Sequence, residues 1–211
     1  MRSKRAAQRV FDCACGVIEQ RLRLKVNREK SSIRHAADAA LLGFRFFMHG
    51  TQYRIRVAAK AVARLKEQLR ALTRRNWSVS MEYRIGRINR FITGWMAYFQ
   101  LADTASLARE MDKWLRRRLR QIRWKEWKRY WTRRRNLRAL GMPERAAREW
   151  AASQKGPWRL AGSFVLQRAL PTAYWTDLGL QGFTISFHRF RDATRTAGCG
   201  PARPVVWEAP G

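Results

Sequence analysis

The chain has 211 residues, of which 46% are hydrophobic, and it carries a formal net charge of +30 at pH 7. This length allows one or two small domains, and the apolar content supports a real core, which excludes a purely disordered basic tail. The 45 Lys and Arg residues are spread along the chain against 15 Asp and Glu residues. Such an excess indicates an extended anionic partner, and a membrane surface is disfavoured because no apolar run approaches 18 residues.

The N-terminus shows no signal peptide, and Cys13, Cys15 and Cys199 form no paired CxxC sets. The cysteines therefore predict neither a zinc site nor a disulfide framework, and they fit a reducing cytosol. Residues 4–22 have a helical pattern that starts almost at the first residue. An isolated domain usually has a short leading segment before its first helix, so we expect this chain to be the C-terminal part of a longer protein.

The next segments predict β structure. Residues 22–31 have the pattern of a short strand, Leu24 to Val26, followed by a polar turn. After an Ala-rich stretch, apolar and basic side chains alternate over residues 41–57, with His49-Gly50 between the two halves. This alternation around a glycine is typical of a β-hairpin.

The rest of the chain has the three- to four-residue apolar period of helices. The expected helices cover 58–75, 81–101, 107–135, 143–153, 163–170 and 171–178. Ser80 is a plausible N-cap, and Pro143 suits a first helical turn. Lys155-Gly156-Pro157 predicts a turn, and 191–211 an irregular tail. The expected fold class is therefore mainly α with a small β-hairpin.

The most basic stretch is 107–135. From Lys113 to Arg135 there are 12 Lys or Arg residues and a single acid, Glu126. Such a run is usually a solvated helix face, but two Arg clusters with almost no acid nearby repel each other unless an anion binds them. We therefore predict phosphate contacts by Arg116, Arg117, Arg120, Arg123, Lys125, Lys128, Arg129, Arg133, Arg134 and Arg135.

The aromatic residues of this stretch fall on two sides of a helix. Trp114 lies on the apolar face of the first half and is expected to pack in the core. Trp124, Trp127 and Trp131 also follow helical spacing, but well over 100° away from that face. Either one helix serves two surfaces, or it bends near Arg123.

A self-contained catalytic constellation is not visible, so we predict no catalytic and no metal-binding residues. No two Asp residues are adjacent, and none sits on a hairpin tip where paired carboxylates hold Mg²⁺ for phosphoryl transfer. The 3 His residues are scattered without ligand spacing. Asp103 and Asp112 flank the start of the basic helix and are expected to complement its dipole.

Several segments carry a resemblance to a known family. They are LRLKVNREKS, LLGFRF, RIRVAAKAVARLKEQLR, INRFITGWMAYFQLAD, MDKWLRRRLRQIRWKEWKR, NLRALGMPERAAREWAASQKGPWRLAGS and RALPTAYWTDLGL. In this order they resemble the C-terminal part of a group II intron-encoded reverse transcriptase, or maturase, and RTAGCGPARPVVWE looks like the ending of some bacterial members. The resemblance covers essentially the whole chain. It implies the end of the palm with its hairpin over 1–57, a helical thumb and maturase-specific domain over 58–190, and the tail.

Individual residues can be carried over from the family. Its N-x-x-K-S segment corresponds to Asn27, Lys30 and Ser31, and the resemblance implies that Lys30 lies near an incoming nucleotide. The family's primer-grip-like hairpin corresponds to Leu42, Gly43 and Phe44, with Leu41 in place of a Phe. Residues 58–76 and 81–135 correspond to the thumb and domain X helices, which in the family bind intron RNA and assist splicing.

The family's Tyr-Ala-Asp-Asp motif would lie just upstream of Met1, so the catalytic carboxylates of the polymerase are absent from this chain. An intact family member needs Mg²⁺ for RNA-directed DNA synthesis. We therefore expect no cofactor in this chain and no polymerase activity from it alone.

Three hypotheses remain open at this point. The first is an RNA-binding maturase fragment that binds group II intron RNA and assists its splicing. The second is the thumb-side half of a split reverse transcriptase, with an upstream catalytic fragment and a DNA primer–template as partners; an exposed sheet edge at 22–26 would favour it. The third is a non-functional remnant of an intron open reading frame. The expected location is the bacterial cytoplasm, with no membrane partner.

Overall fold

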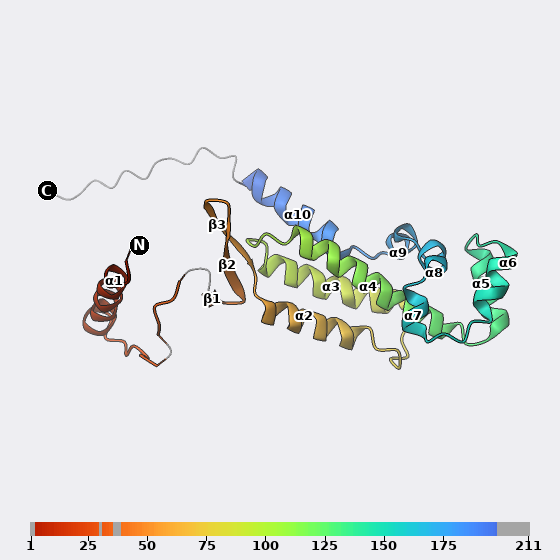
Figure 1. Ribbon diagram of the computed structural model, residues 1–211, viewed down its shortest axis with the longest axis horizontal. Coiled ribbons are helices and arrows are strands. Elements are labelled where there is room, and N and C mark those ends of the chain that lie inside the picture. Colours follow the sequence, from red (N-terminus) through yellow and green to blue (C-terminus); the bar gives the residue numbers. More distant parts are fainter. Residues whose placement is uncertain (1–2, 30, 36–38, 198–211) are drawn as a thin grey trace. The chain divides into compact units, whose positions relative to one another are not determined.

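The computed structural model describes residues 3–29, 31–35 and 39–197 (Figure 1). It is 63% helical, with ten helices and a small three-stranded antiparallel sheet in the described part. The expected fold class, mainly α with a small β-hairpin, is thus confirmed. The chain divides into two compact units, Met1–Arg56 and Val57–Gly211. Lys30 and Cys199 lie outside the described residues.

The first unit begins with two consecutive helical segments. Helix α1, Lys4–Gly16, starts at Ser3, whose side-chain oxygen accepts a hydrogen bond from the main-chain N–H of Ala6 at 3.2 Å. A short π-helix, η1 (Val17–Arg21), continues it. Together these segments fill the helix expected over 4–22.

The strand expected at Leu24–Val26 is wrong, because this segment is irregular. A strand forms only where a neighbour takes up its main-chain hydrogen bonds. The described sheet has the order β1-β2-β3 and does not include this segment. Leu22 and Leu24 are exposed. The sheet edge that would have favoured a split reverse transcriptase is therefore not formed by 22–26.

The hairpin expected over 41–57 is present. It consists of β2 (Phe44–His49) and β3 (Gln52–Val57), and a two-residue strand, β1 (Ala40–Leu41), adds to β2. Leu41 lies opposite Phe44 in the antiparallel β1–β2 pair. Leu42 and Gly43 form the turn between them with φ of 52° and 83°, the left-handed values of a tight hairpin turn. The primer-grip-like residues therefore form this turn and the start of β2.

The second unit is helical. Its helices are α2 (Ala59–Leu72), α3 (Met81–Tyr98), α4 (Ala105–Glu126), α5 (Tyr130–Ala139), α6 (Glu144–Ala151), α7 (Pro157–Ala161), α8 (Phe164–Ala169), α9 (Thr172–Asp177) and α10 (Gly182–Ala197). Ser80 caps α3 as expected, by accepting from the N–H of Tyr83 at 3.2 Å. Helices α2, α3 and α4 run alongside one another, and α10 packs along α3 and α4 (Figure 1).

Buried aliphatic side chains from α2, α3 and α4 form the core of this unit. They include Leu65, Leu69, Ile85, Ile88, Ile92, Met111, Leu115 and Leu119. Trp95 is half-buried at the edge of this core, with its ring centroid 4.5 Å from that of Phe99 and 6.1 Å from that of Phe183. Phe183 from α10 is fully buried, so α10 completes the core.

Two helices were not expected. Helix α7 begins at Pro157, where the sequence predicted only a turn. Helix α10 extends to Ala197, so the irregular tail expected from 191 is wrong for its first residues.

The N-terminus of α10 is capped by a side chain that is distant in the sequence. The Asp112 carboxylate accepts from the N–H groups of Phe183 and Thr184 at 2.7 and 2.9 Å, and from the Thr184 hydroxyl at 2.6 Å.

This contact also corrects the role expected for Asp112. Its buried carboxylate does not complement the dipole of its own helix, because it serves as the N-cap of α10. Gly182 makes room for it. Gly182 has φ of +67°, and a Cβ there would lie 2.9 Å from Asp112 Oδ1.

Candidate nucleic-acid interface

The basic stretch forms two helices, separated at residues 127–129. Helix α4 ends at Glu126, and α5 begins at Tyr130, after Arg129 in an extended conformation. Arg133 on α5 contacts the end of α4 across this interruption. Its Nε–H donates to the Trp127 carbonyl at 2.8 Å, and its guanidinium lies 4.8 Å from the centroid of the Trp124 ring. Of the two alternatives left open by the sequence, the structure has an interruption of the helix, and it falls after Glu126 and not near Arg123.

The four tryptophans of this stretch have three different environments. Trp124 and Trp127 are buried, with ring centroids 6.0 Å apart. Trp114 packs against the core but is only half-buried, with the guanidinium of Arg118 5.4 Å from its ring centroid. Trp131 on α5 is 68% exposed. Trp131 is thus the tryptophan of this group that a ligand can reach most readily.

Two residues of the predicted phosphate-binding set hold α7 against α4. Arg117 lies with its guanidinium 4.2 Å from the centroid of the Trp158 ring and donates to the Trp158 carbonyl at 3.2 Å. Arg120 is 8% exposed and donates from Nε to the Ala161 carbonyl at 3.0 Å. The pKa of Arg120 is lowered to about 10, mainly by burial and in addition by the nearby charges of Arg116 and Arg117.

The prediction that Arg120 contacts a phosphate is therefore corrected. Its side chain is buried and not available at the surface, and its hydrogen bond to the Ala161 carbonyl holds α7 against α4. The reason is α7, which covers this side of α4 and was not predicted from the sequence. Arg118 and Arg84, outside the predicted set, behave similarly. Arg118 donates to Thr73, and the fully buried Arg84 donates to the carbonyls of Leu72, Arg74 and Trp77.

Burial is also the first cause of the lowered pKa of Arg84 and of Arg118. For Arg118 the charges of Arg70 and Arg75 add to the effect. The two Nη atoms of Arg84 and the Nε and Nη2 atoms of Arg118 donate to main-chain or hydroxyl oxygens, which satisfies most of the donors that burial has removed from water. Part of the large positive charge thus stabilises loops between helices.

One carboxylate gathers three arginines at the α5–α6 junction. Glu144 accepts from Arg134 Nε at 2.7 Å, from Arg138 Nη1 at 2.5 Å and from Arg148 Nε at 2.8 Å. These bonds lower the pKa of Glu144, with the Arg148 hydrogen bond as the largest cause. One acid cannot neutralise three guanidiniums, so the cluster keeps a positive charge in a fixed geometry.

The remaining residues of the predicted phosphate-binding set differ in solvent exposure and in their ion-pair partners. Arg123 is half-buried, bonds to Glu126 at 2.9 Å and lies 5.9 Å from the centroid of the Tyr174 ring. Arg116 is half-buried. Four others are exposed and have no ion-pair partner within the described part of the chain: Lys125, Lys128, Arg129 and Arg135. We call these four the open basic set.

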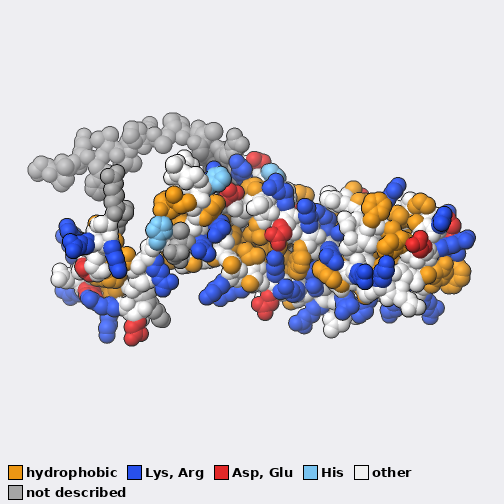
Figure 2. Space-filling model, in the orientation of Figure 1, with side chains coloured by type: hydrophobic (Ala, Val, Ile, Leu, Met, Phe, Trp, Pro, Cys, Tyr) orange, Lys and Arg blue, Asp and Glu red, His pale blue; other side chains and the backbone are white. Residues whose placement is uncertain are grey.

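The exposed ring of Trp131 follows Lys128 and Arg129 of the open basic set in the chain and precedes Arg135 on the same helix, α5. Trp131 is beside Tyr130, with ring centroids 5.0 Å apart, and the Arg134 guanidinium is 5.5 Å from the centroid of the Trp131 ring. Basic side chains are scattered over the visible face of the second unit, and acidic ones are few (Figure 2). Cations on phosphates and an aromatic face on a base are the two elements of single-strand recognition.

The described residues contain no group of three or more His, Cys, Asp or Glu residues that could hold a metal ion. None of the described helices is both long enough and apolar enough to cross a membrane.

Fold and surface together define a basic, mainly helical domain joined to a small β-hairpin unit. Residues 62–141 match the family model of the group II intron, maturase-specific domain. This match supports a group II intron maturase C-terminal region, and such a domain is associated with maturase function in intron splicing. The matched segment runs from α2 to the end of α5 and contains the open basic set and Trp131. A search of the curated proteins found no match.

Proposed function

We propose that this protein is a maturase-type RNA-binding protein, which binds structured group II intron RNA and assists its splicing. The observation that carries the proposal is that the segment matching the maturase-specific domain contains both the open basic set and the exposed ring of Trp131. These cations lack internal partners in the described chain, so they repel one another until an external anion binds. RNA supplies phosphates at regular spacing, and its unpaired bases can stack on an exposed ring.

The proposal assigns different tasks to the two parts of the basic stretch. The buried Arg84 and Arg120 and the half-buried Arg118 shape the domain, and the exposed cations contact RNA. Binding of this kind needs no metal or cofactor held by the chain. We place the protein in the bacterial cytoplasm, and an upstream catalytic fragment and a DNA primer–template remain further proposed partners.

The test combines binding and splicing. The protein is titrated against a group II intron RNA at salt concentrations between roughly 50 and 200 mM, and log K is plotted against log salt. We expect a slope of about −0.7 to −0.9 for every phosphate neutralised. Addition of the protein should also raise the rate of intron self-splicing at low Mg²⁺. A slope near zero, or an unchanged splicing rate with bound protein, would refute the respective half of the proposal.

A further inference from the structure

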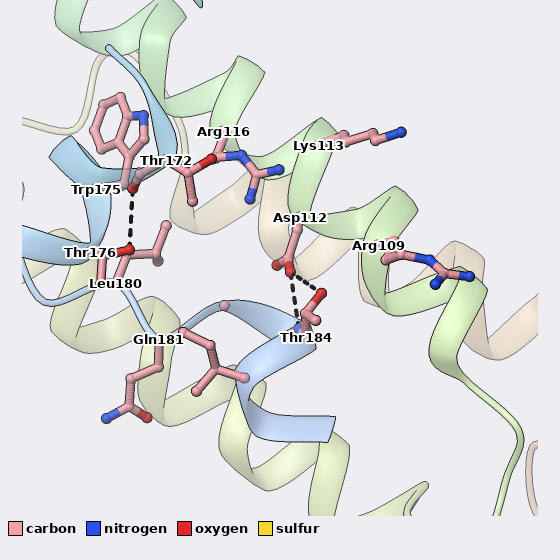
Figure 3. A pocket seen from close by; sticks show the side chains of 12 residues that line it. Arg109, Asp112, Lys113, Arg116, Thr172, Trp175, Thr176, Leu180, Gln181 and Thr184 are labelled. Carbon is pink, nitrogen blue, oxygen red and sulfur yellow. Dashed lines mark hydrogen bonds between the residues drawn. The ribbon is translucent and has the colours of Figure 1, made fainter. Parts of the chain in front are cut away.

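A pocket of about 330 Å³ opens between α4, α9 and the start of α10 (Figure 3). Its volume is near the lower end of the range for ligand sites, about 300–1,000 Å³. It is therefore large enough for one small planar group and too small for a nucleic-acid duplex. Part of its lining belongs to the segment that matches the maturase-specific domain, and the rest comes from residues 172–185.

The α4 side of the pocket is cationic. Arg109, Lys113 and Arg116 are spaced four and three residues apart, which places them on one face of α4. Arg109 and Lys113 are exposed, and none of the three has an ion-pair partner within the described ranges. Figure 3 shows the three side chains leaving the same helix.

The one acid of the pocket lining does not cancel this charge. Asp112 accepts three hydrogen bonds from Phe183 and Thr184, and it sits at the positive end of α10. Its negative charge is therefore taken up by the start of α10. The remaining charge along this side favours a phosphate.

The interior of the pocket is apolar, with one unused hydrogen-bond donor. Leu180, Ile185 and the ring of Trp175 provide the apolar surface. Trp175 is 1% exposed, and its Nε1–H has no acceptor among the described residues. The nitrogen edge of its ring faces the side of the pocket on which Thr172 and Arg116 lie (Figure 3).

A buried donor without an acceptor is unfavourable, and natural structures rarely contain one without a reason. An acceptor on a ligand inside the pocket would satisfy it. The Thr176 hydroxyl also lines the pocket and donates to the Thr172 carbonyl at 3.2 Å, so its oxygen stays able to accept. The pocket thus combines an apolar interior, one donor, one acceptor and an adjacent cationic face.

We propose that this pocket holds a single unpaired nucleotide of the bound RNA. The base lies against Leu180 and Ile185, and one of its acceptor atoms meets the Nε1–H of Trp175. The attached phosphate lies on Arg109, Lys113 and Arg116. Proteins that read RNA commonly take unstacked bases from loops and bulges, whereas a paired base is not accessible to such a pocket. This inference rests on the proposed function and adds the chemical unit that is recognised.

The experiment compares two RNA hairpins of equal length, one fully paired and one with a single-nucleotide bulge. Affinities are measured for the full chain and for Trp175→Phe, which removes the N–H and keeps an aromatic ring. Ile185→Trp is the second variant, because Ile185 is exposed on the pocket lining and a larger side chain there fills the space. Thermal melting checks that each variant is folded.

We expect the full chain to prefer the bulged RNA. Trp175→Phe should reduce this preference roughly 2- to 10-fold, which is the range for one hydrogen bond. Ile185→Trp should abolish the preference. The triple variant Arg109→Gln, Lys113→Gln, Arg116→Gln should weaken the bulged RNA more than the paired RNA. Its control replaces three exposed arginines of α2 and α3, Arg64, Arg87 and Arg90, by Gln and should weaken both RNAs equally.

Equal binding of both RNAs, or a bulge preference that survives Ile185→Trp, overturns the pocket inference and leaves the proposed function standing. If neither hairpin binds and a group II intron RNA does not bind either, the proposed function fails. The pocket is then tested by equilibrium dialysis with AMP, GMP, CMP and UMP. Saturable binding that Ile185→Trp abolishes supports a nucleotide site, and no binding of any of the four overturns it.

Discussion

Arg120 donates its Nε–H to the main-chain carbonyl of Ala161 at 3.0 Å, and this bond joins the middle of α4 to the end of α7. The guanidinium is buried, yet it belongs to the same run of arginines that faces the surface elsewhere. A single basic stretch therefore performs two tasks. The two tasks can be separated by mutation, because they fall on different residues.

Arg120→Gln should destabilise the fold. A hydrogen bond to a charged group is worth about 1.5–3 kcal/mol, and we expect a loss of this size in the free energy of urea-induced unfolding. Arg135→Gln is the matched control, because Arg135 is exposed and surface changes usually stay within about 0.5 kcal/mol. Equal unfolding midpoints for the two variants would contradict the structural role of Arg120.

Replacement of the open basic set, Lys125, Lys128, Arg129 and Arg135, by Gln should weaken RNA binding and leave the melting temperature nearly unchanged. Each lost phosphate contact should make the salt slope shallower by about 0.7 to 0.9. The control replaces four exposed cations of the first unit, Lys4, Arg5, Arg9 and Lys25, by Gln and removes the same net charge. If the control lowers the affinity and the slope as much, the binding is not localised to this set.

Trp131→Ala and Trp124→Ala should have opposite consequences. Trp131 is exposed, so its loss should leave stability unchanged and reduce RNA affinity by about 1–3 kcal/mol, the value of one stacked base. Trp124 is buried against Trp127, and its loss should cost about 3–5 kcal/mol of stability. Calorimetric melting and RNA titration of both variants provide the comparison. Unchanged RNA affinity in Trp131→Ala would exclude stacking on this ring.

Gly182→Ala should destabilise the protein through the cap of α10. The new Cβ would lie 2.9 Å from Asp112 Oδ1, and the φ of +67° is unfavourable for any residue with a Cβ. Asp112→Ala should be destabilising too, by about 0.5–2 kcal/mol, the usual effect of losing an N-cap. Because both changes break the same contact, the double variant should lose less stability than the sum of the two. Additive losses would show that the two residues act separately.

We expect Glu144 to make part of the free energy of unfolding depend on pH. Its arginine partners hold its pKa in the folded protein below the ordinary value of 4.5. A carboxyl group with a lowered folded pKa contributes stability above its unfolded pKa, and the contribution is lost as the pH falls through the folded pKa. Glu144→Gln should therefore flatten the decline of stability at pH values below about 4.5. Urea unfolding of both proteins between neutral pH and acid would reveal this, and parallel curves would exclude it.

The sequence predicted those elements whose cause is local. Helix α3 has a regular aliphatic stripe and its own serine cap, and the hairpin has apolar residues alternating with arginines in each strand around a glycine. Both formed as expected. Helix α10 was missed because its N-cap is a carboxylate on α4, and no local pattern reveals a partner 71 residues away.

The candidate site was predictable as a region and less so residue by residue. The density of arginine identified α4 and α5, but the pattern could not show which guanidiniums become buried. That distinction depends on α7, whose five residues begin at a proline that suggested only a turn. Trp131 was grouped with Trp124 and Trp127 because helical spacing places them together, and the break after Glu126 separates them.

The Asp112–α10 contact has a consequence for where this protein can be divided. The family match ends at residue 141, yet the carboxylate of Asp112 within it is satisfied by residues 183 and 184. Phe183, Trp175 and Leu160 also belong to the core that the matched helices share. A version that stops at residue 141 would therefore expose that core to water and leave the buried face of α4 uncovered. The smallest piece of the second unit able to fold by itself must extend through α10.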